Sequence, residues 1–204
     1  MKLDAQHHRP RSARRRPAVL RWTERVLWCI ALFCLGTVLV VYADAFVYQE
    51  TAQLPVAADD GGLQRAAREE AARPGTPIAR LAIPRLDLDV VVAEGSSDRV
   101  LRRAVGRLSG GAFPGEPGNV VIAGHRDTFF RPLENVRTGD LIVIDSESGR
   151  RTYRVEWTRV VAPDEVEVLS SGRSRVLTLV TCYPFRYVGN APLRFIVRAR
   201  ERQS

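Results

Sequence analysis

Cysteine and histidine are scarce in this chain of 204 residues. Two of the three cysteines, Cys29 and Cys34, lie in an apolar run near the N-terminus, and only Cys182 lies in the rest of the chain. A disulfide within the C-terminal part is therefore excluded. No Cys-x-x-Cys pair occurs, and His125 is the only histidine after residue 8, so the sequence offers no ligand pattern for a zinc site. We expect no cofactor.

Excess charge is confined to one short segment. The formal net charge is +8, and residues 1–25 contain eight basic and two acidic side chains. That segment therefore contributes +6, which leaves the remaining residues nearly neutral at +2. A neutral remainder argues against nucleic acid as a partner. The length suits one ordinary domain with some additional chain and excludes a large multidomain enzyme.

One long apolar run is present, from Val26 to Ala43, with 18 residues and no charge. As a helix at about 1.5 Å per residue it would cover about 27 Å, close to the hydrocarbon core of a bilayer. Basic residues precede the run and aromatic residues flank it on both sides, as in membrane anchors. We therefore expect a cytoplasmic tail at 1–25, a single transmembrane anchor at 26–48, and the rest of the chain outside the plasma membrane.

Two alternatives remain for this run. Ala43-Asp44-Ala45 fits the cleavage pattern of a signal peptide, and Arg15-Arg16 weakly resembles a twin-arginine signal, although the run is longer than usual for such signals. A buried core helix is the other alternative, and it would need a larger domain around it. After the run, residues 49–75 indicate a stem or linker.

From residue 76 the sequence changes to short apolar runs separated by turn residues, which predicts a mainly β domain over 76–204. Eight short strands favour a closed β-barrel. One short helix is expected at 97–104, with Ser96 or Ser97 as its N-cap. The expected strands are 78–83, 88–92, 119–123, 140–145, 152–161, 166–169, 175–181 and 193–199.

The expected domain contains one thiol, Cys182, and one imidazole, His125, each at the end of an expected strand. Strand ends at the rim of a barrel are both rigid and exposed, which suits catalysis. A thiol needs a neighbouring base or cation to react as thiolate, and the imidazole can supply it. A structural interpretation competes, because free cysteines are often buried and a lone histidine is often structural.

The context of both residues resembles the sortase family. Residues 178–194 read TLVTCYPFRYVGNAPLR, similar to the TLxTC motif of sortases with an essential arginine on the following strand. Thr178, Leu179, Thr181, Cys182 and Arg194 occupy the places of that motif. The segment AGHRDTFF at 123–130 resembles the one that holds the catalytic histidine, and the surrounding sequence is similar to class D sortases in particular.

This resemblance implies a sortase-type eight-stranded β-barrel and a cysteine transpeptidase. Such an enzyme cleaves a sorting signal of LPxTG or LPxTA type after its threonine and transfers the acyl group to an amine, for example a peptidoglycan precursor or a pilin lysine. Its partners would be secreted proteins with C-terminal sorting signals. Cys182 would form the thioacyl enzyme, His125 would shuttle the proton, and Arg194 would bind the carbonyl oxygen.

Other functions remain open. A cysteine hydrolase or protease would release its product to water, and an idle barrel would bind wall or pilus polypeptides without reacting. An L,D-transpeptidase is less compatible, because its SxGC-type motif is missing.

Polar residues beside the His and Cys motifs have simpler interpretations. Arg126 and Asp127 flank His125, and a pair that stabilises the turn is favoured over a role in orienting the histidine. Arg186 is expected in solvent. The loop 182–192 connects Cys182 to the strand of Arg194, and we expect it to form one side of the substrate cleft.

Arg198 and Arg200 share the alternating face of Arg194, and we expect them on a polar barrel surface. By resemblance, residues 161–174 would face the Leu-Pro part of the signal. Some sortases carry a Ca2+ site in that region, but no acidic cluster here is distinctive enough to predict one.

Overall fold

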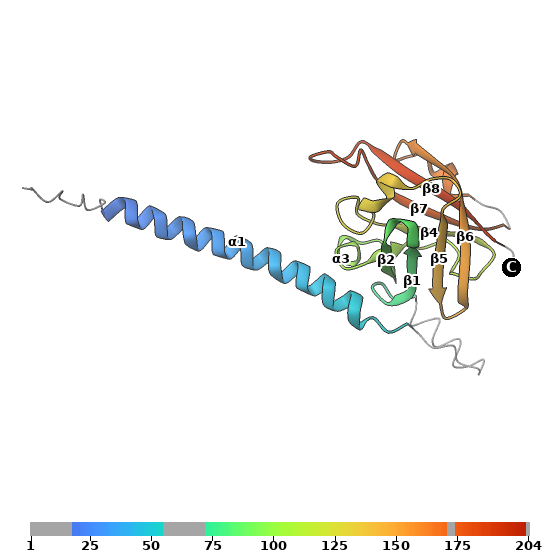
Figure 1. Ribbon diagram of the computed structural model, residues 1–204, viewed down its shortest axis with the longest axis horizontal. Coiled ribbons are helices and arrows are strands. Elements are labelled where there is room, and N and C mark those ends of the chain that lie inside the picture. Colours follow the sequence, from blue (N-terminus) through green and yellow to red (C-terminus); the bar gives the residue numbers. More distant parts are fainter. Residues whose placement is uncertain (1–17, 55–71, 171–173, 203–204) are drawn as a thin grey trace, which may run out of the picture. The chain divides into compact units, whose positions relative to one another are not determined.

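The computed structural model describes residues 18–54, 72–170 and 174–202. The chain divides into two compact units, Met1–Tyr42 and Ala43–Ser204. Figure 1 shows the long N-terminal helix and the strands of the second unit, coloured along the sequence.

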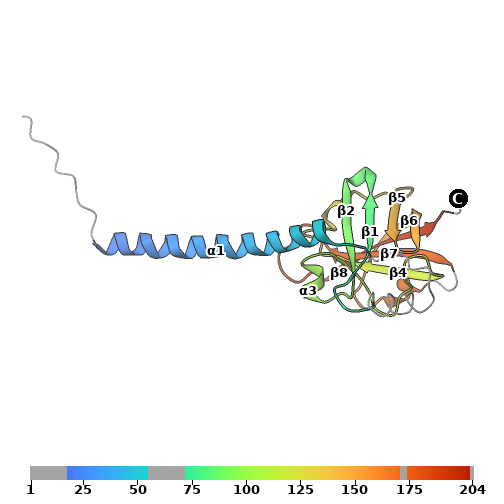
Figure 2. The same ribbon diagram turned by 90° about the horizontal axis from the view of Figure 1, so that it is seen from below.

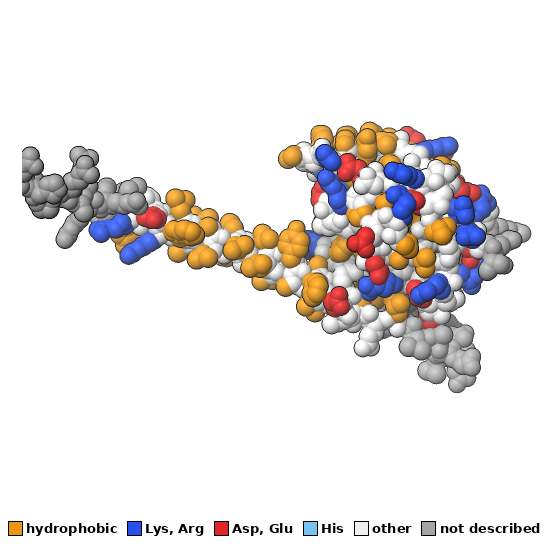
Figure 3. Space-filling view, viewed as in Figure 1, with side chains coloured by type: hydrophobic (Ala, Val, Ile, Leu, Met, Phe, Trp, Pro, Cys, Tyr) orange, Lys and Arg blue, Asp and Glu red, His pale blue; other side chains and the backbone are white. Residues whose placement is uncertain are grey.

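Helix α1 (Ala18–Thr51) is continuous over 34 residues. Its segment Arg21–Thr51 is long and apolar enough to cross a membrane, and the mean hydropathy of its apolar window is 2.5. None of that window is buried, and Figure 3 shows apolar side chains along the helix. Such exposure argues against the core-helix alternative and suits contact with lipid. The helix also continues beyond both ends of the expected 26–48 segment.

A closed eight-stranded barrel forms the second unit, in the strand order β1-β2-β3-β4-β7-β8-β6-β5. The pairs β2–β3 and β4–β7 are parallel, and the other neighbouring pairs are antiparallel. Figure 2 shows β4 beside β7. The expected mainly β fold with a closed barrel is confirmed. Its strands are β1 (Pro77–Ile83), β2 (Leu88–Glu94), β3 (Val105–Arg107), β4 (Gly118–Ala123), β5 (Leu141–Ser146), β6 (Gly149–Val161), β7 (Arg175–Tyr183) and β8 (Leu193–Glu201).

Alternate residues of the strands fill the barrel. Val120 and Ile122 of β4 and Leu177 and Leu179 of β7 belong to one buried apolar cluster. Each such side chain stabilises the fold by roughly 1.5–3 kcal/mol through its burial. Because strand side chains alternate between faces, the intervening residues of these strands lie on the outside of the barrel.

Two expectations about single elements are wrong. Residues 166–169, expected as a strand, form the 3-10 helix η3 (Val166–Leu169), and the three-residue β3 was not expected. A closed barrel leaves no free edge where a further strand could pair, so the VEVL segment lies over the barrel instead. The expected helix at 97–104 is shorter, α3 (Asp98–Leu101), with Ser97 at its N-cap position. Two more 3-10 helices are η1 (Pro84–Leu86) and η2 (Arg131–Asn135).

The last turns of α1 belong to the second unit and contact its strands. The side-chain amide of Gln49 donates to the carbonyl of Arg103 at 2.7 Å and accepts from the N–H of Val91 at 2.8 Å. The hydroxyl of Tyr48 donates to the carbonyl of Gly75 at 2.8 Å. Tyr48 and Ala52 also pack against a small buried cluster of Val91, Ala93, Val100 and Ala104. The end of α1 is thus part of the domain's packing.

Candidate functional site

Cys182 and Arg194 face each other across β7 and β8. They are direct partners in the antiparallel register, which places their Cα atoms about 4.5 to 5.5 Å apart with both side chains on one face. Leu179 and Val197 of the same strands point into the core, so alternation directs Cys182 and Arg194 outward. The half-buried residues Cys182 and Arg194 therefore lie side by side on the outer face of the barrel.

The guanidinium of Arg194 rests against the backbone of its own loop. Its Nη1 donates to the carbonyls of Ala191 at 3.2 Å and Leu193 at 2.9 Å. Its Nε and Nη2 make no hydrogen bond to any residue that the structure describes. These nitrogens remain available for an oxygen of a bound ligand.

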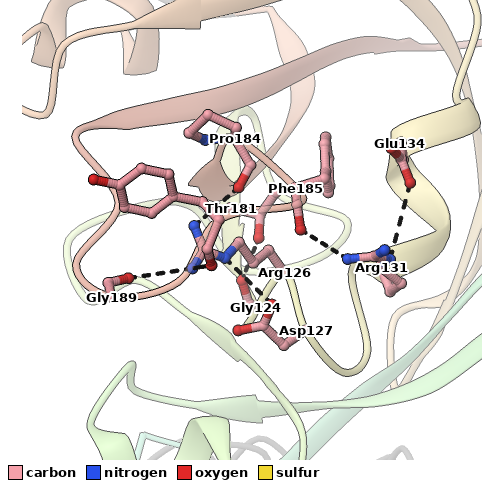
Figure 4. A network of polar contacts seen from close by, with 10 residues as sticks. Gly124, Arg126, Asp127, Arg131, Glu134, Thr181, Pro184, Phe185 and Gly189 are labelled. Atoms are coloured by element: carbon pink, nitrogen blue, oxygen red, sulfur yellow. Dashed lines mark hydrogen bonds and ion pairs between the residues drawn. The ribbon is translucent and has the colours of Figure 1, made fainter.

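His125 follows the end of β4 at the rim where β7 also ends. Since β4 and β7 are parallel, their C-terminal ends lie at the same edge. The N–H of Gly124 donates to the carbonyl of Val180 at 3.1 Å, and the hydroxyl of Thr181 donates to the carbonyl of Gly124 at 2.7 Å. These two bonds join the residue before His125 to the residues before Cys182, and Figure 4 shows the second of them.

Gly124 and Phe130 shape the turn that contains His125. A Cβ atom on Gly124 would lie 2.6 Å from the ring of Phe130, which is fully buried. The N–H of Phe130 donates to the carbonyl of His125 at 3.1 Å and closes the turn. Only glycine leaves room for the ring at this distance, so this packing fixes the backbone of His125.

The loop between β7 and β8 is bound to the His125 segment by further polar contacts. Arg131 Nη1 donates to the carbonyl of Phe185 at 2.7 Å (Figure 4). Phe185 is buried and contacts the rings of Tyr183 and Phe195. Arg186, expected in solvent, has an 80% exposed side chain, with only a 3.5 Å ion pair to Glu134 of η2.

A polar cluster on the outer face, formed by Asn119, Thr178 and Arg198, holds η3 against β4, β7 and β8. The side-chain amide of Asn119 donates to the carbonyl of Leu169 at 2.5 Å and accepts from Thr178 Oγ1 at 2.9 Å. Arg198 donates to the carbonyls of Val168 at 3.0 Å and Ser170 at 2.9 Å. Three consecutive carbonyls of the β6–β7 connection are thereby bound to side chains of β4 and β8, and Thr178 of β7 supports Asn119.

These contacts correct the expectation that Arg198 belongs to a plain polar surface. Its guanidinium is covered by η3, and burial lowers the pKa of Arg198 from its usual value. Arg200 does match the expectation, because it is exposed and pairs with Glu156. Asn119 and Arg131 were not singled out from the sequence, since donors to backbone carbonyls leave no pattern in it.

No group of three or more His, Cys, Asp or Glu side chains that could hold a metal ion occurs in the described part of the chain. The arrangement of one thiol, one imidazole on the adjacent strand end and one guanidinium with free donors suits acyl transfer by a cysteine nucleophile.

Comparisons with known proteins agree with this geometry. The Sortase domain family matches residues 81–202. Sortase D of Bacillus subtilis is 36% identical over 118 residues, which cover 57% of this chain and 60% of the relative. Sortase SrtE1 of Streptomyces coelicolor is 36% identical over 130 residues, 54% of this chain and 37% of the relative. The chain thus spans less than two thirds of the length of either relative.

A solved structure has the same barrel. The Sortase D5 transpeptidase of Clostridium perfringens superimposes with a TM-score of 0.62 at 29% identity, covering 71% of this chain and 91% of that one. The family match covers more than half of the chain and includes all three residues of the candidate site. This chain therefore belongs to the sortase family and most resembles its class D members.

Proposed function

We propose that this protein is a membrane-anchored cysteine transpeptidase that cleaves a sorting signal of LPxTG or LPxTA type after its threonine. The acyl group would pass to an amine, such as a cell-wall precursor or a pilin lysine. The observation that carries the proposal is the direct register of Cys182 with Arg194 beside the strand end that bears His125.

The proposed reaction has two acyl transfers. The sulfur of Cys182 attacks the threonine carbonyl, the peptide C–N bond breaks, and His125 gives a proton to the leaving amine. An incoming amine then attacks the thioester, His125 takes its proton, and the C–S bond breaks so that Cys182 leaves as a thiolate beside the protonated imidazole. Arg194 donates to the carbonyl oxygen while negative charge develops on it in both steps.

The outer face of the barrel offers a place for an extended peptide between two walls. One wall is η3, held by Asn119 and Arg198, and the other is the β7–β8 loop. A hollow of about 580 Å³ lies beside η3 and is lined by residues 108–112, by Val121 and by Leu169 of η3. It provides space for the part of the signal that precedes the threonine.

The proposed membrane arrangement is supported by the apolar helix α1. Eight basic residues lie in the first 25 residues, and the tendency of positive segments to stay inside supports a cytoplasmic location for this tail. Fractionation with an N-terminal tag should find tag and domain together in the membrane. A soluble, tag-free product that starts near Asp44 would support signal cleavage instead.

The decisive experiment incubates the full-length protein in detergent with a library of LPxTG and LPxTA peptides, with and without an added amine, and identifies products by mass spectrometry. The only lysine of the sequence is Lys2, so an acyl adduct mapped to the domain reports the thioester and not an amide on a domain lysine. We expect cleavage after threonine, transfer to the amine, and no activity in Cys182→Ala.

Other outcomes identify the competing functions. Release of acid at an unchanged rate when amine is present would indicate a hydrolase. An idle barrel would form no adduct, and its Cys182 would react slowly with alkylating agents. More than a few per cent of transfer activity in Cys182→Ala would refute the proposed nucleophile.

A further inference from the structure

The side chain of Arg126 reaches from the His125 turn to the loop between β7 and β8. Its Nη1 donates to the carbonyl of Pro184 at 2.9 Å, and its Nη2 donates to those of Tyr187 at 2.7 Å and Gly189 at 3.3 Å. Figure 4 shows the guanidinium between this loop and the turn. Only 7% of the side chain is exposed.

The contact of Arg126 with Asp127 within the turn is weaker than the bonds of Arg126 to the loop. Asp127 accepts from Arg126 Nε at 3.3 Å, and its own side chain is 67% exposed. A pair whose carboxylate is in solvent contributes little. The three loop carbonyls instead satisfy the donors of a buried guanidinium, which burial would otherwise penalise. The turn-stabilising role expected from the sequence is therefore secondary.

The loop that Arg126 holds has few other means of support. Between Tyr183 and Leu193 the chain forms no helix or strand, and Val188 at its tip is 99% exposed. The packing of Phe185 and its bond from Arg131 hold the start of the loop. Among the described contacts, the bonds to Tyr187 and Gly189 come from Arg126 alone.

The same loop provides the carbonyls that hold the Arg194 guanidinium. Ala191 and Leu193, whose carbonyls bind the Arg194 guanidinium, are the residues that lead the loop into β8. A shift of the loop would therefore move the tip of Arg194 relative to Cys182. Because Arg126 is the neighbour of His125 in the chain, its side chain links the His125 turn to the loop that runs from Cys182 to Arg194.

We propose that Arg126 is a positioning residue, which fixes the β7–β8 loop so that Arg194 and His125 keep their places around Cys182. This inference rests on the proposed transpeptidase function. Lysine cannot replace Arg126, because its compact ammonium on a flexible stem does not present donors in the fixed, spread directions in which the planar guanidinium reaches the three carbonyls.

The test compares Arg126→Lys and Arg126→Gln with the wild type in the full-length protein. Asp127→Asn is the matched control, since it removes the pair within the turn and leaves the loop bonds intact. Hydrogen exchange of residues 183–193 reports the loop without any need for catalysis. Steady-state kinetics separate kcat from KM, and thermal unfolding reports the fold.

We expect faster exchange in the loop for both Arg126 variants and near wild-type exchange for Asp127→Asn. The kcat of the Arg126 variants should fall by about tenfold or more, with a smaller change in KM, because small misplacements of catalytic groups are costly. Unchanged hydrogen exchange of the loop in both Arg126 variants would overturn the inference that Arg126 fixes the β7–β8 loop. An unchanged kcat would overturn its role in positioning Arg194 and His125. An equal loss in Asp127→Asn would assign the effect to the turn.

Failure of the proposed function has a separate signature. In that case the wild type transfers no acyl group, whereas loop exchange still responds to Arg126→Lys. If Arg126→Lys does not fold, Arg126→Gln gives the same readouts with a neutral side chain.

Discussion

Cys182 and Arg194 are opposite residues of one antiparallel pair, flanked in register by Thr181 with Phe195 and by Tyr183 with Leu193. The distance between their backbones is therefore set by the sheet and not by the loop that joins the strands. Loop movement can redirect the end of the Arg194 side chain, but it cannot separate the two Cα atoms.

This relationship predicts that arginine is required at position 194. Arg194→Lys keeps the charge but loses the fixed fork of donors, so turnover should fall by roughly 100 to 1000-fold, as for loss of a preorganised oxyanion donor. Thermal unfolding should be near normal. Arg186→Lys, on the exposed loop, is the control and should be unaffected. Half the wild-type rate in Arg194→Lys would show that charge alone suffices.

The polar cluster of Asn119, Thr178 and Arg198 under η3 predicts a larger effect on KM than on kcat. Asn119→Asp places a carboxylate against the carbonyl of Leu169, and Arg198→Gln removes the bonds to Val168 and Ser170. Both changes should loosen residues 162–170 and raise KM more than they lower kcat. A loss of about 1–3 kcal/mol would raise KM by roughly 5- to 150-fold. Steady-state kinetics with a sorting peptide measure this division.

Arg200→Gln is the control for that polar cluster. Arg200 lies on the same face of β8 and, among the described residues, pairs only with the partly exposed Glu156. Its kinetics should match the wild type. An equal rise of KM in Arg200→Gln would mean that the charge of the surface, and not the position of η3, sets peptide affinity.

The ion pair of Arg85 with Asp140 predicts acid sensitivity. Arg85 donates to both carboxylate oxygens at 2.5 and 2.6 Å and lowers the pKa of Asp140 from 3.8. A lowered pKa in the folded state means that the contribution is complete above pH 3.8 and is lost as the pH falls further. Asp140→Asn should lower the melting temperature at pH 7 and reduce the difference between pH 7 and pH 3.

The control for Asp140→Asn is Asp145→Asn, since Asp145 forms an exposed ion pair with Arg150. It should have little effect at either pH. Wild-type acid sensitivity in Asp140→Asn would assign the effect to other carboxylates.

The end of α1 predicts that the folded domain begins before residue 76. Gln49→Ala leaves the carbonyl of Arg103 and the N–H of Val91 without their partner, which should cost about 1–3 kcal/mol of domain stability. Thr51→Ala is the control, because among the described residues the Thr51 hydroxyl bonds only to Val47 within the helix. A fragment that starts at Ala43 should melt higher than one that starts at Leu54. Equal melting temperatures would show that the helix end does not stabilise the domain.

The barrel and the Cys182 and Arg194 strands were predictable from the sequence, because their apolar runs are long enough to define strands. Residues 166–169 have the same alternation, but a barrel already closed by its other strands has no edge for them. Val105–Arg107 is too short for a pattern and is a strand only because β2 and β4 lie on either side. The roles of Arg126 and Arg198 depend on carbonyls 58 to 63 and 28 to 30 residues away in sequence, which local patterns cannot reveal.

The side chains that hold the two walls of the site bind main-chain oxygens. Every residue presents the same carbonyl, so these anchors do not depend on which side chains the two loops carry. In the proposed peptide complex, substitutions at the loop surfaces should therefore alter which peptide is preferred while the geometry of the nucleophile stays intact. In the engineering of new specificities, the loop positions are accordingly open to randomisation, whereas Asn119, Arg126, Arg131 and Arg198 should be left unchanged.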